Sequence, residues 1–191
     1  FKVVGTKEEH NMNISKFTIK SQEALADMQD IAIQYGNQEI SAEHLLYALL
    51  KQEQGIVGTI IRKLSAVEQN LKPLIEQDVL KLIEEKPKVQ GATPYLNQDL
   101  NKIFTVSEKI AKDLKDEYVS TEHIFLAVIS FPNLQATKIL NKYGITQEKV
   151  LNALVSIRGS NRVTDQNPED KYQALEKYGR DLTALAKKGK L

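Results

Sequence analysis

The sequence predicts an all-α fold in which one helical unit is written twice. The stretch SAEHLLYALL, which begins at Ser41, returns 79 positions later as STEHIFLAVI, beginning at Ser120. The same offset places Ile40 on Val119, and apolar residues follow the three-and-four spacing of helix faces on both sides. Because similarity at one fixed offset marks an internal repeat, we expect two four-helix units packed as one pseudo-twofold body.

The first unit is expected to contain helices at about residues 18–35, 41–50, 56–64 and 67–83. The first of these ends before Gly36, since glycine readily takes the left-handed conformation that follows a helix. Ser41 is a favourable N-cap, and Glu43 in the next turn complements the helix dipole. Pro73 fits the fourth helix only in its first turn or at a bend.

The second unit repeats this order after a boundary at residues 86–94 (KPKVQGATP), where two prolines and a glycine interrupt any helix. Apolar residues from Leu100 to Leu114 predict a long helix, Ser120 caps the next one, and Phe131 with Pro132 ends it. Two more helices are expected at 134–143 and 147–157. The two repeats therefore occupy residues 12–85 and 95–158, which form one domain, 12–158.

Both ends of the chain differ from this body. Residues 1–11 show no helical period, and we interpret them as a leader or a remnant of cloning, without the apolar segment of a secretory signal. Residues 159–168 are polar and rich in helix breakers, which predicts a flexible linker. An amphipathic helix is expected from Glu169 to Lys188. Residues 159–191 thus form a linker and a helix, which we expect to lead into a further module.

Composition excludes several classes of function. The chain has no cysteine and no apolar run of about 18 residues, so disulfides, thiolate chemistry and a membrane span are not expected. Residues 171–191 carry six basic and two acidic side chains, which leaves the rest of the chain mildly acidic despite a net charge of +1. Nucleic-acid binding is not expected from such a body, because phosphate affinity depends on clustered lysine and arginine.

The residues do not favour catalysis or metal binding by this chain. Each unit has one histidine, His44 or His123, whereas a zinc site needs two or three at ligand spacing. We interpret both as packing or capping residues at helix starts. The chain has no G-x-x-x-x-G-K-[ST] loop to hold nucleotide phosphates and no nucleophile motif. The chain itself is therefore not expected to be an enzyme.

Three stretches carry a family resemblance: FTIKSQEAL from Phe17, the paired Ser-x-Glu-His boxes, and ALEKYGRDLT from Ala174, followed by GKL at the end of the chain. Together they resemble the amino-terminal domain of ClpB-type disaggregase chaperones, which are hexameric AAA+ machines. The resemblance covers about residues 12–191. The boxes alone fit protease-coupled unfoldases equally well, but the segment from Ala174, which in the family leads into the first ATPase module, favours the disaggregases.

The resemblance implies a module that binds exposed apolar segments of unfolded or aggregated client proteins and passes them to an ATPase ring. ATP and Mg would belong to other modules of a homohexameric parent, so no cofactor is expected in this chain, which should be a monomer by itself. The resemblance favours docking of the basic helix on an ATPase module over binding to a membrane. A cytoplasmic location is expected, bacterial or alternatively an organelle matrix.

The resemblance also places a shallow apolar groove between the two halves, near the starts of the two long helices. Its candidate lining residues are Phe17, Leu25, Tyr95, Leu100 and Phe104. An unfolded client offers apolar side chains without a fixed sequence, so an apolar concavity suits it. The alternative is that each residue is ordinary core, because apolar residues at helical spacing are normally buried. Tyr95 is the best groove candidate, since it lies at the repeat boundary.

Three polar residues match the family pattern: Thr18, Asp116 and Glu122. Thr18 and Glu122 are candidates for the groove or for its coupling to the ring. Thr18 has the alternative role of capping the first helix, and Glu122 that of complementing a helix N-terminus. Because a cap contributes about 1 kcal/mol, substitution of either would also affect stability.

Two other functions stay open. One is an adaptor-docking domain of a protease-coupled Clp unfoldase, whose partner would be a small folded protein. The other is a stand-alone scaffold of helical repeats. A folded partner that competes with denatured clients would favour the first, and a native gene that continues into a P-loop module would exclude the second.

Overall fold

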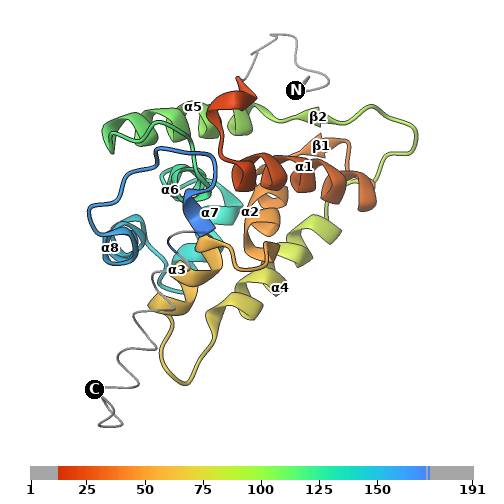
Figure 1. Cartoon of the computed structure of the whole chain (residues 1–191). Helices are drawn as coiled ribbons and strands as arrows, with labels where there is room; N and C mark the ends of the chain where they lie inside the picture. Colours follow the sequence, from red (N-terminus) through yellow and green to blue (C-terminus); the bar gives the residue numbers. More distant parts are fainter. Residues whose placement is uncertain (1–12, 171, 173–191) are drawn as a thin grey trace.

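The structure, a computed structural model, describes residues 13–170 and 172 and confirms the all-α, duplicated fold. The first repeat contains α1 (Ile19–Gln34), α2 (Ala42–Lys51), α3 (Ile56–Leu64) and α4 (Leu71–Glu84), and the second contains α5 (Gln98–Asp113), α6 (Thr121–Ile129), α7 (Gln135–Lys142) and α8 (Gln147–Arg158) (Figure 1). A short 3-10 helix, η1 (Ile14–Lys16), precedes α1, and the described residues also contain two short strands, β1 (Glu39–Ile40) and β2 (Tyr95–Leu96). The predicted leader and most of the predicted C-terminal helix lie outside the described residues.

Local signals set the helix ends. Thr18 Oγ1 accepts a hydrogen bond from the Ser21 backbone N–H, and so caps α1. Gly36 takes φ +69° just after α1, where a side chain would be strained. The fourth helix starts later than predicted, at Leu71, because the Asn70 side chain caps it. Its Pro73 consequently lies in the first turn, where its missing N–H is not needed.

The two short strands, which periodicity over so few residues cannot predict, join one repeat to the other. Ile40 of β1 pairs in parallel with Leu96 of β2, and Phe17 pairs in the same way with Val119. At the repeat offset of 79, Leu96 is the counterpart of Phe17. Each long helix is therefore preceded by a short parallel pairing with the opposite repeat, in which the Thr18 N–H donates to Val119 O and the Asn97 N–H donates to Ile40 O.

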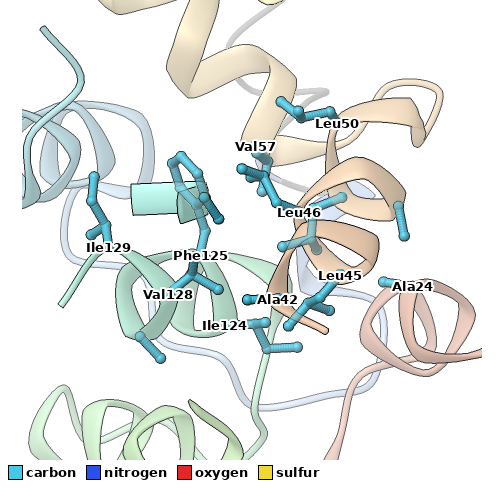
Figure 2. Packing of buried hydrophobic residues seen from close by; sticks show 14 of the residues in the cluster. Ala24, Ala42, Leu45, Leu46, Leu50, Val57, Ile124, Phe125, Val128 and Ile129 are labelled. Carbon is cyan, nitrogen blue, oxygen red and sulfur yellow. The ribbon is translucent and has the colours of Figure 1, made fainter. Parts of the chain in front are cut away.

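The helices also pack across the boundary between the two repeats. α3 of the first repeat contacts α6 and α8 of the second, and its counterpart α7 contacts α2 and α4 of the first. At the centre, α2 and α6 pack on each other. Figure 2 shows side chains of these two helices, among them Leu46 and its counterpart Phe125, gathered in one cluster. Both are fully buried, so the two repeats share a single hydrophobic core.

The segment predicted as a flexible linker lies against the body instead. We call residues 159–170 the C-terminal segment; it runs from α8 back to the start of α1 (Figure 1). The Ile19 N–H donates to Gln166 O at 3.0 Å, and the Glu117 N–H donates to Val163 O at 2.8 Å. Val163 is fully buried. The polar composition of the C-terminal segment predicted mobility, but backbone groups of the segment form hydrogen bonds with the folded domain.

Among the described residues, no helix has both the length and the apolar character needed to cross a membrane.

Candidate functional site

Four of the five candidate groove residues are buried. Phe17, Leu25 and Leu100 expose nothing, and Phe104 exposes very little. Leu25 lies on α1, which packs against α2, and the other two long-helix residues lie on α5, which packs against α6. Their side chains offer no surface to a client in this conformation. Client contact through them stays a prediction that would require the core to open.

Tyr95 differs from the other four because 36% of it is exposed. It lies on β2, and its hydroxyl donates to Glu39 Oε2 at 3.3 Å. The negative charge of Glu39 raises the pKa of Tyr95 above its usual value. At the offset of 79, Tyr118 is the counterpart of Glu39, and Lys16 is the counterpart of Tyr95. The repeats join at two places, the pairing of β1 with β2 and the pairing of Phe17 with Val119, and each joint thus combines one tyrosine with one charged residue.

A pocket of about 460 Å³ lies at the second of these joints. Its walls come from η1, α5 and the connection to α6, and they comprise Lys16, Glu108, Ala111, Lys112, Lys115, Asp116, Glu117, Tyr118 and Val119. The lining of the pocket is mixed: Ala111, Tyr118 and Val119 are apolar or aromatic, and the other six residues are charged.

Sequence reasoning missed Ile19, an exposed apolar residue at the start of α1. Ile19 is 39% exposed. It directly follows Phe17, which pairs with Val119 of the second repeat, and Thr18, which caps α1. The internal repeat contains a signal for the exposure of Ile19, because the counterpart of Ile19 at the offset of 79 is the polar Gln98. A position that is apolar in one repeat and polar in the other does not need to be buried. Tyr95 lies at the pairing of β1 with β2, and Ile19 and Tyr118 lie beside the pairing of Phe17 with Val119; these three residues at the two joints are named the boundary surface below.

Asp116 is the centre of a buried hydrogen-bond network. Its carboxylate accepts from His123 Nε2 at 2.7 Å, from Arg158 Nη1 and Nη2 at 3.0 and 2.6 Å, and from the Val163 N–H at 2.9 Å. Burial by itself would raise the pKa of Asp116. The hydrogen bonds from His123 and Arg158 outweigh that effect and hold the pKa well below its usual range. Asp116 therefore fixes α6, α8 and the C-terminal segment to one another.

The first repeat has a neutral version of this network. Asn37 stands at the position equivalent to Asp116, and its Oδ1 lies 2.9 Å from His44 Nε2. The Ser41 N–H donates to His44 Nδ1, so His44 Nε2 carries the proton and donates to Asn37. Burial first and the charge of Lys86 second lower the pKa of His44 to about 4. His44 and His123 both complete capping boxes, which confirms their interpretation as capping residues.

Thr18 and Glu122 meet at a second buried cluster beside this network. Thr18 Oγ1 donates to Glu169 Oε1 at 2.7 Å, and the Thr121 N–H donates to the same oxygen at 3.3 Å. Glu122 is fully buried in the first turn of α6, with its Oε1 3.6 Å from Arg158 Nη1. Both structural alternatives for Thr18 and Glu122 are thus confirmed, and any further role for them stays a prediction.

The structure brings Thr18, Asp116 and Glu122 together through Arg158 and Glu169, which sequence reasoning did not select. One signal could have pointed to Arg158: a glutamate at a buried helix start needs a cation nearby. In the first repeat, Lys86 lies 3.5 Å from the equivalent Glu43.

Within the part of the chain that the structure describes, no group of three or more His, Cys, Asp or Glu side chains is arranged to hold a metal ion.

Comparison with known proteins gives one consistent result. Residues 16–143 match the family described as Clp repeat (R) N-terminal domain. The chain is 43% identical over 186 residues to the chaperone protein ClpB of Nitratidesulfovibrio vulgaris, covering 94% of this chain and 21% of that protein. It is 40% identical over 185 residues to ClpB of Clostridium tetani, with the same two coverages. The chain thus spans about a fifth of the length of these relatives.

Solved structures share the fold at lower sequence identity. The Hsp104 N-terminal domain from Candida albicans has a TM-score of 0.68 and 19% identity, covering 81% of this chain and 99% of that one. The N-terminal domain of the ClpV1 ATPase from Escherichia coli has a TM-score of 0.61 and 19% identity, covering 73% of this chain and 83% of that one.

Proposed function

Because this chain belongs to the family of Clp repeat N-terminal domains, we propose that it is the substrate-recognition module of a ClpB-type AAA+ disaggregase. In that role it binds exposed apolar segments of unfolded or aggregated proteins and passes them to the ATPase ring of the same polypeptide. The ring, a homohexamer, binds ATP and Mg²⁺, while this module by itself is a monomer. The bacterial cytoplasm is its proposed location, since the ClpB relatives come from bacteria.

The observation that carries this proposal is the exposure of aromatic and apolar side chains where the two repeats join. Tyr95 and Ile19 are each more than one third exposed, and Tyr118 is half-buried beside the pocket. A tyrosine ring offers an apolar face and a polar hydroxyl, so it contacts many sequences without requiring one. The boundary surface therefore suits weak and sequence-tolerant binding of an unfolded chain.

The test is a titration of the isotope-labelled chain with a permanently unfolded, apolar-rich polypeptide. Amide chemical shifts are expected to change at Ile19, Tyr95 and Tyr118, with an affinity in the micromolar range or weaker. Unchanged shifts at high client concentration would exclude client binding. A small folded protein that displaces the client would instead favour the adaptor-docking function.

Replacing Tyr95 by alanine is expected to weaken client binding about threefold to tenfold, because an aromatic contact contributes about 0.5–1.5 kcal/mol. Tyr95 is partly exposed and loses only its hydrogen bond to Glu39, so the free energy of unfolding should fall by no more than about 1 kcal/mol. Fluorescence anisotropy of a labelled client measures the first effect, and urea unfolding measures the second.

Val155→Ala is the matched control, since Val155 is an apolar residue, 61% exposed, on α8. It should leave client binding unchanged. Equal loss of binding in both variants would mean that the boundary surface is not the site.

A further inference from the structure

Buried side-chain oxygens without a hydrogen-bond partner concentrate at one place among the described residues. They include both carboxyl oxygens of Glu122, Oε2 of Glu169, the Thr121 hydroxyl and the Tyr172 hydroxyl. Glu122 and Glu169 are almost completely buried, and each has at least one oxygen that meets no donor. An unsatisfied buried carboxyl oxygen is costly, so this arrangement requires an explanation.

Glu169 reaches the cluster from the C-terminal segment. It accepts from the Thr18 hydroxyl at the start of α1 and from the Thr121 N–H at the start of α6. Three residues earlier, Gln166 O accepts from the Ile19 N–H. Glu169 therefore attaches the C-terminal segment to the N-termini of two helices, one from each repeat.

The charges around Glu169 do not balance if every carboxyl is ionised. On α6, Glu122 faces it, and His123 binds Asp116, which precedes α6. On α8, the positively charged Arg158 is bound to Asp116 and lies 3.6 Å from Glu122.

Tyr172, beyond Glu169 in the chain, lies against Arg158, and α1 contributes the uncharged Thr18. The cluster thus contains three carboxyl groups, Asp116, Glu122 and Glu169, and one arginine, which contacts the first two. A single added proton would relieve the excess negative charge.

We propose that Glu122 and Glu169 share one proton, and that this proton holds the C-terminal segment on the domain. The proton lies on Glu169 Oε2 or on one Glu122 oxygen, where it removes one of the two buried negative charges. When it is lost, two buried carboxylates repel each other, and Glu169 leaves its site at the starts of α1 and α6. The release of Glu169 uncovers Thr18 and Glu122, so access to both depends on pH.

The direction of the pH dependence follows from Glu169. Burial first and the charge of Glu122 second raise its pKa from 4.5 to about 7, although the hydrogen bonds from Thr18 and Thr121 act in the opposite direction. The attached form binds the proton more tightly than the released form. Attachment is therefore strongest below about pH 4.5, weakens as the pH rises to about 7, and is weaker by on the order of 10²-fold above that.

The test uses the full chain and measures ¹H–¹⁵N heteronuclear NOE values of residues 164–167 and of residue 169 from about pH 5 to about pH 8.5. In the unaltered protein these values are expected to fall across neutral pH as the segment is released. In Glu169→Gln the side chain cannot ionise, so the C-terminal segment should stay attached over the whole pH range. Glu122→Gln removes the repelling charge, so release should shift to higher pH.

Asp170→Asn is the matched control, because Asp170 is the exposed neighbour of Glu169. It should leave the pH of release unchanged. NOE values that stay constant in the unaltered protein, or that fall equally in Glu169→Gln, would overturn the proposal. The measurement contains no client, so its failure leaves the proposed client binding standing, and a lack of client binding leaves this inference standing.

Discussion

Replacing Phe125 by alanine is expected to lower the free energy of unfolding by about 3–5 kcal/mol. Phe125 is fully buried on α6, at the centre of the shared core (Figure 2). Loss of the ring removes apolar contacts and leaves a cavity that the packed helices around it cannot close. Urea unfolding followed by circular dichroism measures the change, and the dependence on urea should keep its slope.

The duplication provides matched variants for this experiment. Leu46→Ala, at the equivalent position of α2, is expected to cost about 2–5 kcal/mol and to shift the same single transition. Phe125→Leu introduces the residue that the first repeat uses there, so it should cost less than Phe125→Ala. If Leu46→Ala and Phe125→Ala affected two separate transitions, the repeats would be independent folding units, contrary to the exchanged packing of α3 and α7.

Replacing Asp116 by alanine is expected to lower the free energy of unfolding by about 3–5 kcal/mol, because it leaves the buried Arg158 without its main partner. It also removes the acceptor for the His123 ring and for the Val163 N–H. Asp116→Asn should cost less, since Asn37 accepts from a histidine in the same way in the first repeat. Thermal and urea unfolding measure both variants.

The effect of Asp116 should also depend on pH in a defined direction. Its pKa is lowered in the folded domain, so its carboxylate contributes stability above the usual carboxyl pKa of about 4. That contribution is lost as the pH falls towards the lowered value, and the difference between the natural protein and Asp116→Asn should shrink in acid. The control is Asp113→Ala at an exposed pair with Lys109, which should change stability by no more than about 0.5 kcal/mol. Equal effects of Asp113→Ala and Asp116→Ala would show that the network does not stabilise the fold.

The three polar residues of the family pattern stabilise the fold, and this complicates any test of their function. Asp116, Thr18 and Glu122 all have structural partners in the buried clusters. A loss of chaperone activity in an alanine variant of any of them must therefore be compared with its stability. This difficulty is smaller for Tyr95→Ala, because that side chain is partly exposed.

The sequence by itself determined the repeat, the order of the helices and most of their ends. Thr18, Gly36 and Ser41 mark helix boundaries correctly because a cap acts on backbone groups within one turn of it. The family resemblance, carried by the stretch from Phe17, the two boxes and the segment from Ala174, was also available from the residues alone. The match to residues 16–143 and the similarity to ClpB proteins confirm it.

Only the tertiary structure decided which helix faces are covered and which residues meet. Phe17 and Leu100 have the apolar pattern expected of either a groove or a core, and their burial depends on helices that come later in the chain. Glu169 lies 151 residues from Thr18, and its contact with Thr18 leaves no signal in the local pattern of either residue. Caps and periodicity act between near neighbours in the chain, whereas burial and a shared carboxyl site depend on how distant segments pack.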